Sequence, residues 1–179
     1  MDTNEHQVTE IEFTVTYLQM EARPAKLQVA CPADEVTVVR SYRPTASFYS
    51  YLYNAVGGPW NWLDRNLLGE DELRKIIQDE SVELHVLYVA GTPAGFTELD
   101  FCDPHDVELK YFGLMPEFIG RGLGRYLLDW TIDRAWSANC RRFWLHTCTL
   151  DHPRALPNYL AAGFQPFRTE VKRRKVTDS

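Results

Sequence analysis

The stretch PEFIGRGLGRYLL, residues 116–128, decides how the rest of the chain is interpreted. Its glycines at 120, 122 and 124 come directly before a run with the apolar spacing of an amphipathic helix. Glycine lowers helix propensity and loses the most entropy on folding. Two explanations offset that cost: a ligand that approaches the backbone closely, or a tight turn that packs the helix on a sheet. Because the first amides of a helix lack partners and carry the positive end of its dipole, this turn suits a phosphate group.

Two arginines, Arg121 and Arg125, add formal charge to this loop. Two common phosphate-loop patterns nevertheless fail here. The dinucleotide pattern G-x-G-x-x-G requires glycine at position 125, and the P-loop pattern requires Gly-Lys-Ser/Thr at its end. We therefore do not expect ATP or NAD to be the preferred ligand.

Composition indicates one globular domain. The chain has 179 residues, of which 45% are hydrophobic and 25% charged, enough to bury a core. A net charge of −6 argues against nucleic acid as a partner, since such domains usually carry a basic surplus. No apolar run approaches the roughly 20 residues that span a membrane. Four cysteines without metal-ligand spacing predict reduced thiols in a cytoplasmic protein with no metal: Cys31, Cys102, Cys140 and Cys148.

Hydrophobic periodicity predicts an α/β domain over residues 10–172, between a disordered tail at 1–9 and a second tail at 173–179. The basic run at 172–175, in the last eight residues, is expected to be a solvated tail, and the alternative is a nucleic-acid or targeting patch. The alternation of strand and helix patterns favours a mixed sheet with helices on both faces. Strands are expected over 11–17, 35–42, 83–90, 94–101, 107–114, 142–150 and 164–171, and helices after Pro44, near 71–77, after Gly124 and over 155–162.

Two motifs, taken together, resemble those of the GNAT superfamily of N-acetyltransferases. The glycine stretch is similar to the family's Gln/Arg-Gly-x-Gly-x-Gly/Ala, and RALPNYLAAGF, residues 154–164, is similar to its Arg-Ala-x-x-x-Tyr-x-x-x-Gly-Phe. Ile119 departs from the first motif, and His152 stands where the family has Asn. The resemblance extends over about 35–171. It implies a GNAT-like α/β fold: a central mixed, mostly antiparallel sheet, helices on both faces, and a splayed strand pair that holds acyl-CoA.

The resemblance also implies acetyl-CoA as the acyl donor, without a metal. Its pantetheine would enter a gap between the strand at 107–114 and the strand at 142–149, where Leu114 and Met115 would offer backbone groups to its amide and its thioester carbonyl. An amide in that position is an oxyanion donor, commonly worth a few kcal/mol to the transition state. The pyrophosphate would lie on the residues of the loop: Gly120, Arg121, Gly122, Leu123, Gly124 and Arg125.

Acetyl transfer to an amine requires a proton donor for the departing thiolate. Tyr159 matches the tyrosine of the second motif, which acts as this general acid in many relatives. A phenol with a pKa near 10 stays protonated at neutral pH, as a donor must. The alternative is a tyrosine that only packs its helix on the sheet. Pro157 requires this helix either to begin late or to kink.

The ammonium of the acceptor must also lose a proton. Glu108, thirteen residues before Arg121, has the spacing of the catalytic glutamate in histone-type relatives and is the first candidate base. By alternation it shares a face with Lys110 and Phe112, so a surface ion pair with Lys110 is an equal alternative. Glu98 is the second candidate, for the base or for the substrate site, and water is a third. His146 and His152 are also considered, although a lone histidine is more often structural.

The acceptor site is expected in the aromatic segment after Pro44. Trp60 and Trp62 adjoin Gly57-Gly58-Pro59 and are candidates for lining a cleft, since aromatic faces attract cations. Small amines and peptide or protein amines both fit, and the C-terminal strand could pair two chains into a homodimer. The leading hypothesis is an N-acetyltransferase with direct transfer in a ternary complex. The alternative is a GNAT-like acyl-CoA sensor or interaction module without turnover.

Overall fold

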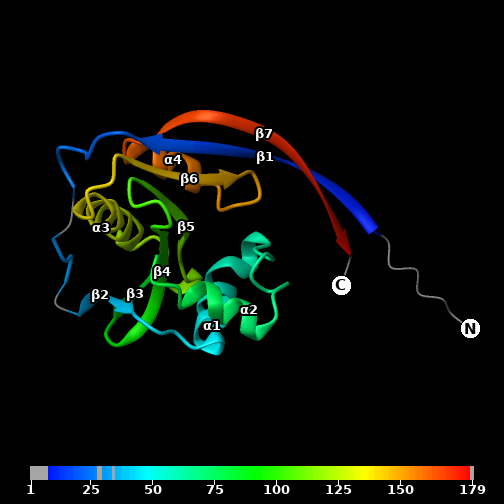
Figure 1. Ribbon diagram of the computed structural model, residues 1–179, viewed down its shortest axis with the longest axis horizontal. Coiled ribbons are helices and arrows are strands. Elements are labelled where there is room, and N and C mark those ends of the chain that lie inside the picture. The colour runs from blue at the N-terminus through cyan, green and yellow to red at the C-terminus, as the bar shows by residue number, and fades with distance from the viewer. Residues whose placement is uncertain (1–7, 28–29, 34, 178–179) are drawn as a thin grey trace, which may run out of the picture.

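Seven strands form one sheet in the order β2-β3-β4-β5-β6-β1-β7 (Figure 1). The structure, a computed structural model, describes residues 8–27, 30–33 and 35–177. All neighbouring strands are antiparallel except β5 and β6, which are parallel. The mixed, mostly antiparallel sheet is thus confirmed. The strands are β1 (Val8–Met20), β2 (Val36–Ser41), β3 (Val82–Val89), β4 (Thr92–Asp100), β5 (Asp106–Leu114), β6 (Arg142–Cys148) and β7 (Gln165–Thr177).

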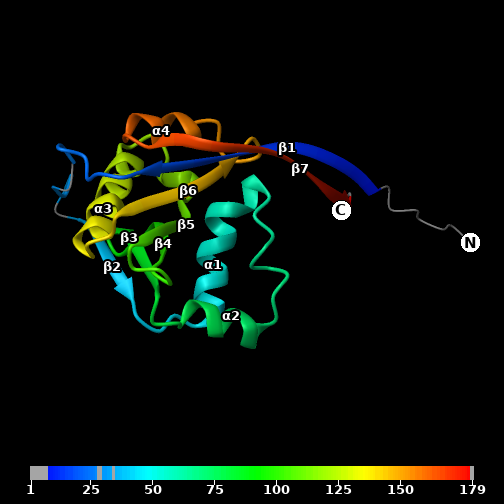
Figure 2. The ribbon, with the colours of Figure 1, turned by 45° about the horizontal axis from the view of Figure 1, so that its top comes forward.

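Helices cover both faces of the sheet, as predicted. α1 (Ala46–Gly57) and α2 (Glu70–Ile77) lie on one side, and α3 (Leu123–Ser137) and α4 (Ala155–Ala161) lie on the other (Figure 2). Short 3-10 turns, η1 (Gly58–Trp60) and η2 (Pro116–Phe118), follow α1 and β5. Within the described ranges, none of the helices has the length and apolarity that crossing a bilayer requires.

Each face of the sheet has its own apolar layer. Under α1 and α2, the rings of Tyr49 and Tyr53 are fully buried together with Phe96 of β4. Under α3 and α4, Phe143 of β6 packs against Phe164, with ring centroids 5.5 Å apart. Burial of this kind stabilises a fold by roughly 25 cal/mol per Å² of apolar surface, so both helix pairs are held to the sheet.

A buried carboxylate joins β2, β3 and α3. Glu83 of β3 accepts hydrogen bonds from Arg134 (Nη2–Oε1 2.6 Å) and Arg40 (Nη1–Oε1 2.8 Å), and His85 Nε2 lies 2.8 Å from its second oxygen. Burial alone would raise the pKa of Glu83, but the bonds from His85 and Arg134 and the charges of both arginines lower it to about 2. The carboxylate is therefore ionised at neutral pH and holds three elements together.

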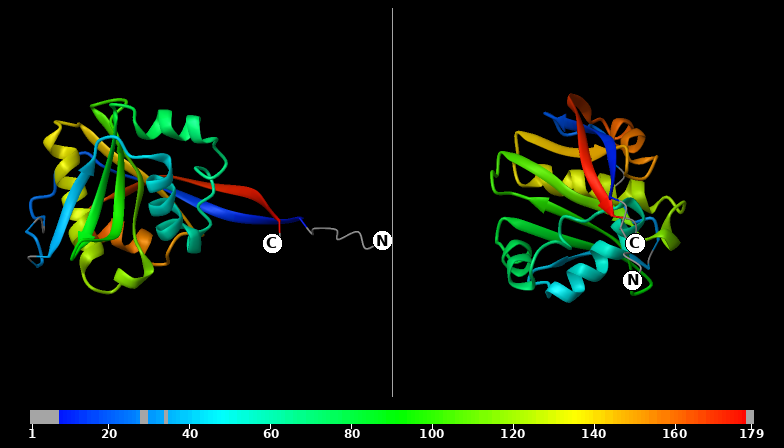
Figure 3. Two further views of the ribbon diagram at one scale, coloured as in Figure 1. Left: turned by 90° about the horizontal axis from the view of Figure 1, so that it is seen from below. Right: turned by 90° about the vertical axis from the view of Figure 1, so that its right-hand side faces the viewer.

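The first and last strands are longer than the sequence predicted. β1 begins at Val8 and β7 ends at Thr177, so residues 8–9 and 173–177 are strand rather than tail. We call residues 8–14 with 171–177 the arm, and Figures 1 and 3 show it running past the rest of the sheet. The pairing of the two strands supplies backbone hydrogen bonds that a basic charge run does not reveal. The remaining tail residues, 1–7 and 178–179, lie outside the described residues.

Candidate active site

The parallel strands β5 and β6 pair over only part of their length. Asp106 to Leu109 lie opposite Arg142 to Leu145. Beyond Leu109 the strands separate, and a cleft of about 660 Å³ is lined by residues of both. The predicted splayed strand pair is thus confirmed.

A β-bulge in β5 lies at the point where the strands separate. In the ladder with β4, Leu99 pairs with Leu109 and Glu98 pairs with Tyr111, so Lys110 has no partner. Such an extra residue bends its strand and increases the local twist. The bend accompanies the loss of pairing with β6 and the opening of the cleft.

The bulge also resets which side chains share a face. Lys110 lies beside Glu108, with Nζ 2.6 Å from Oε2. Phe112, however, faces α4, where its ring centroid is 6.2 Å from that of Tyr159. The prediction that Phe112 shares a face with Glu108 is wrong, because regular alternation does not continue through a bulge.

Backbone groups of β5 line the open edge of the cleft. Met115 is committed elsewhere, because its N–H donates to the carbonyl of Ala94 (2.8 Å) and its own carbonyl accepts from Phe118 N–H (3.0 Å). The prediction that Met115 offers backbone groups to a ligand is therefore not met in this structure. Hydrogen bonding alternates along an antiparallel ladder, so Leu114 and Phe112 direct their backbone groups away from β4, toward the gap.

The glycine loop forms the neighbouring wall. Gly120 (φ 85°) and Gly122 (φ 78°) adopt the left-handed conformation that glycine tolerates, and no atom lies within 4 Å of where their Cβ atoms would be. Gly122 is the N-cap of α3, and Tyr126 N–H is the first to bond back, to Gly122 O (3.3 Å). The amides before Tyr126 thus lack helical acceptors. This cradle fits a phosphate group.

The side chains of the loop divide between the cleft and the core. Arg125 lines the cleft and is held by Asp129, with Nε 2.8 Å from Oδ2. Ile119, where the motif has a polar residue, also lines the cleft. Leu123 is buried in the core, and Arg121 lies over the ring of Phe118 outside the cleft. Of the two predicted arginines, only Arg125 is placed at the cleft.

Tyr159 of α4 lines the same cleft. Pro157 lies in the first turn of α4, so it does not kink the helix. Burial, followed by the charge of Asp151, raises the pKa of the Tyr159 phenol above its ordinary value. The phenol is therefore protonated at neutral pH, as a proton donor has to be.

Glu108 reaches the cleft only through a neighbour. Its side chain is 10% exposed, and its carboxylate contacts Lys110 and His146 (Nδ1–Oε1 3.5 Å). Burial alone would raise its pKa, but the His146 ring and the Lys110 ammonium lower it overall. His146 lines the cleft and Glu108 does not.

Glu98 lies in the core behind the cleft. It is 1% exposed, and its oxygens accept from Tyr49 Oη (2.5 Å) and Arg65 Nη2 (2.6 Å). The Arg65 guanidinium also lies over the ring of Tyr111 (5.2 Å). One oxygen of Glu98 thus binds α1 through Tyr49, and the other binds the segment before α2 through Arg65. No pattern in the sequence singles out Arg65, because a lone arginine in an irregular segment matches no motif.

Residues 58–64, which we call the strap, carry the two predicted tryptophans over the cleft. Trp60 and Trp62 both line it. The ring of Trp60 lies 4.9 Å from that of His152, so the motif departure at His152 forms part of the contact. Arg174 of the arm donates to the carbonyl of Asn61 (Nη2–O 3.3 Å). The strap therefore contacts both the α4 side of the cleft and the arm.

Asp151 fixes the position of Trp62. The Trp62 indole donates to Asp151 Oδ1 (Nε1–Oδ1 3.2 Å), while Oδ2 accepts from Thr147 Oγ1 (2.7 Å) and Cys148 N–H (2.8 Å). A Cβ at Gly57 would lie 2.2 Å from the Trp62 ring, so glycine is required for this close approach. Sequence reasoning missed Asp151, which no motif singles out.

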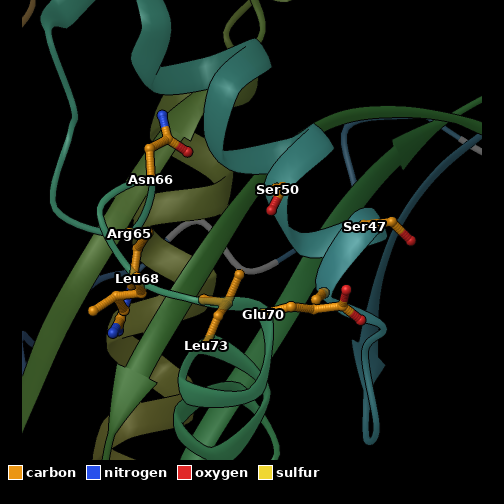
Figure 4. Close-up of a pocket in the computed structure, with 8 residues that line it drawn as sticks. Ser47, Ser50, Arg65, Asn66, Leu68, Glu70 and Leu73 are labelled. Atoms are coloured by element: carbon orange, nitrogen blue, oxygen red, sulfur yellow. The ribbon is translucent and has the colours of Figure 1, made fainter.

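A smaller pocket of about 340 Å³ lies between α1 and the segment that leads into α2 (Figure 4). It contains none of the candidate catalytic residues or loop glycines. We therefore assign the active site to the larger cleft. The smaller pocket is lined by Ala46, Ser47, Ser50, Arg65, Asn66, Leu68, Glu70 and Leu73.

Cys148 places a thiol at the cleft. Burial, followed by the charge of Asp151, raises the pKa of this thiol, so it is protonated at neutral pH. Such a thiol is a weak nucleophile. Over the described residues, no group of three or more histidine, cysteine, aspartate or glutamate side chains could hold a metal ion.

Comparison with known proteins gives one family. The family model described as the acetyltransferase (GNAT) family matches residues 47–164. A mycothiol acetyltransferase from Streptosporangium roseum is 33% identical over 91 residues, a match that covers 51% of this chain and 26% of that protein. This chain thus matches about a quarter of that relative's length.

Solved structures share the fold. A GCN5-related N-acetyltransferase from Sphaerobacter thermophilus matches 97% of this chain and 55% of its own, with 15% identity and a TM-score of 0.65. An aminoglycoside acetyltransferase from an uncultured soil metagenomic sample, solved with sisomicin, matches 73% of this chain and 88% of its own, with 10% identity and a TM-score of 0.60. At these identities the likeness concerns the fold alone.

Proposed function

Because the chain belongs to the acetyltransferase (GNAT) family, a family of acyltransferases, we propose that it transfers an acetyl group from acetyl-CoA directly to a primary amine in a ternary complex. One observation carries this proposal. A single cleft is lined by the glycine loop at the start of α3, the open edge of β5 and Tyr159. These are the parts that an acyl-CoA donor requires: a phosphate cradle, backbone hydrogen bonds and an acid.

The residues present fit acetyl-CoA. Its pyrophosphate would bind the free amides that follow Gly122, with Arg125 beside them, since helix starts favour anions. Its pantetheine would bind the open backbone groups of Leu114 and Phe112. When bound, acetyl-CoA would supply the acetyl group as a thioester. The Phe112 N–H would then stabilise the negative charge that develops on the carbonyl oxygen, an effect commonly worth about 3–4 kcal/mol.

The side chains of the cleft would perform the two proton transfers. Tyr159 would donate a proton to the departing sulfur, because its raised pKa keeps the phenol protonated. A carboxylate with a lowered pKa is a weak base for an ammonium. We therefore propose that His146, rather than Glu108, takes the proton from the ammonium of the acceptor. Because Nδ1 of His146 faces Glu108, Nε2 can accept the proton. Glu108 is then a positioning residue that orients the His146 ring.

Direct transfer, without an acetylated enzyme, is the simplest scheme for this cleft. Cys148 is the cysteine that lines it, and its raised pKa leaves little thiolate to be acetylated. The amine would instead attack the thioester carbon itself. We propose that it enters from the side of the strap, where Trp60 and Trp62 line the cleft.

Isothermal titration with acetyl-CoA, with ATP as the control ligand, tests the donor site. We expect micromolar binding of acetyl-CoA by the wild type and its loss in Gly122→Glu, because a charged side chain would fill the phosphate cradle. Gly91→Glu is the matched control. Gly91 (φ 80°) lies in the turn between β3 and β4 with open space around it, so it bears the same strain and charge outside the cleft.

The outcomes separate the competing functions. Binding that Gly122→Glu alone abolishes, with CoA release in the presence of an amine, supports the acetyltransferase. Binding without CoA release by any amine would instead favour the acyl-CoA sensor. No binding by the wild type, or equal loss in both variants, would overturn the assignment of the loop.

A further inference from the structure

The wall of the cleft is basic although the chain is acidic, with a net charge of −6. Of its two carboxylates, Asp151 is already used by Trp62, Thr147 and Cys148. The positive side chains that line the cleft thus outnumber its carboxylates. Asp64 and Asp151 are the two carboxylates that line the cleft, and the cations are Lys110, Arg125, Arg154, Lys172, Arg173 and Arg174.

The donor accounts for only some of these cations. Arg125 follows the glycine loop and donates to the carbonyl of Ala161 at the end of α4 (Nη1–O 3.5 Å), so it lies next to the proposed phosphate site. Arg154 is the N-cap at the other end of α4. The cations at 172–174 belong to β7, which β6 and β1 separate from β5 in the sheet. A donor bound between β5 and β6 would therefore not account for this second group of cations.

Two cations near the acceptor side are already neutralised. Lys110 binds Glu108 (Nζ–Oε2 2.6 Å), and Arg173 binds Glu12 (Nη2–Oε2 3.0 Å) with 66% of its side chain exposed. On β7 these pairs leave Lys172, whose ion pair with Glu170 is long (3.7 Å), and Arg174 as the cations most open to a ligand.

Arg174 and Lys172 retain free donors. Arg174 forms no ion pair with any described carboxylate; it donates to the neutral carbonyl of Asn61, and its buried Nε has no hydrogen-bond partner. Lys172 Nζ is 3.7 Å from Glu170 and 3.3 Å from the Tyr17 hydroxyl. Residues two apart on a strand share a face, so the two cations point to the same side of β7.

We propose that the amine acceptor also carries an anionic group, a carboxylate as in an amino acid, and that Lys172 and Arg174 bind it. This inference rests on the proposed function, since it concerns the acceptor of the same cleft. Arg174 donates a hydrogen bond to Asn61 of the strap. An anion bound by Arg174 would therefore lie beside the tryptophans of the strap. A polycation such as an aminoglycoside would meet repulsion at the same place.

The test uses the wild type saturated with CoA, which binds an acceptor without turnover. Isothermal titration compares amines that differ only in the anion: glycine with glycinamide, and phenylalanine with phenylalaninamide. O-phosphoethanolamine with ethanolamine forms a further arm that distinguishes phosphate from carboxylate, and sisomicin represents the polycations. Hydrogen bonds between charged groups predict that an acid binds about tenfold or more tightly than its amide.

Variants of neighbouring residues test the assignment. Lys172→Gln and Arg174→Gln should each reduce the preference for the acid about fivefold or more, while the affinity for the amide stays the same. Arg173→Gln, which removes a cation already paired with Glu12, should change the preference less than twofold. Constant amide binding also shows that each variant is folded.

Several results would overturn the inference while leaving the proposed function intact. They are equal affinity for acid and amide, binding of neither, tighter binding of sisomicin, or no effect of Arg174→Gln, each with acetyl-CoA binding retained. Preference for O-phosphoethanolamine alone would contradict the assignment of the anionic group as a carboxylate. Failure of acetyl-CoA itself to bind would instead contradict the proposed function.

Discussion

Gly57→Ala is expected to destabilise the strap although alanine is the better helix former. Gly57 ends α1 with φ −94° and ψ −16°, so alanine meets no backbone strain. Its Cβ, however, would lie 2.2 to 2.5 Å from three atoms of the Trp62 ring. The indole would have to move by more than about 1 Å to restore ordinary contact distances. It is held by Asp151 and packs against Tyr53 and Tyr111.

The size of the effect follows from these contacts. Forcing atoms into a packed core costs about 1–3 kcal/mol, and losing the bond from Trp62 to the Asp151 carboxylate costs about 1.5–3 kcal/mol. Replacing glycine in a compatible conformation returns about 0.4–1 kcal/mol. We expect Gly57→Ala to lower the free energy of unfolding by about 1.5–5.5 kcal/mol. It should also raise the KM for the acceptor while the affinity for acetyl-CoA changes less than twofold.

Urea unfolding followed by circular dichroism measures the difference, with an unchanged m-value as the sign that compactness is retained. Gly69→Ala is the control, because Gly69 has φ −68° and open space around it; as an N-cap change it should cost less than about 1 kcal/mol. The double variant Gly57→Ala, Trp62→Leu should have the same free energy of unfolding as Trp62→Leu alone, because the clashing indole is absent from both. Equal stability of Gly57→Ala and Gly69→Ala would refute the reasoning.

Three further predictions concern the core and the chemistry. Arg65→Met would leave the buried Glu98 carboxylate unpaired, so urea unfolding should show a loss of about 3–5 kcal/mol that Glu98→Gln partly restores; no restoration would contradict the pairing. The pKa of Glu83 is about 2, against an ordinary 4.5. Its carboxylate therefore stabilises the fold above pH 4.5, and this stabilisation is lost as the pH falls toward 2. The difference in unfolding free energy between wild type and Glu83→Gln should therefore shrink by about 3 kcal/mol over that range, and a constant difference would argue against it. Tyr159→Phe should lower kcat about 100-fold or more with an unchanged dissociation constant for acetyl-CoA, whereas normal turnover would remove the proposed acid.

Local patterns in the sequence were enough to predict the regular elements. Alternating apolar residues marked the strands, and helical spacing marked the run after Gly124, because burial of one face dominates both choices. The two motifs led to the cleft, since the left-handed Gly120 and Gly122 and the helix that presents Tyr159 are local features. Family resemblance then supplied the separation of the two parallel strands, which periodicity alone does not predict.

Features that depend on pairing between distant segments were not predictable. Residue 110 fits regular alternation in the sequence, and only the ladder with β4 reveals the bulge that turns Phe112 toward Tyr159. Met115 appeared free because its acceptor, Ala94, belongs to another strand. The basic run at 172–175 has the composition of a solvated tail, and only its pairing with β1 places Arg174 at the cleft.

Because β1 lies between β6 and β7, the first strand along the chain cannot acquire either neighbour until residues beyond 142 have been synthesised. During that time both of its edges present unpaired N–H and C=O groups, the kind of template on which chains aggregate. Contacts so far apart in sequence also form slowly, since the loop must close first. On the ribosome, the half of the cleft formed by β5 and the glycine loop can therefore take shape before the arm, and the half that the arm lines is completed last.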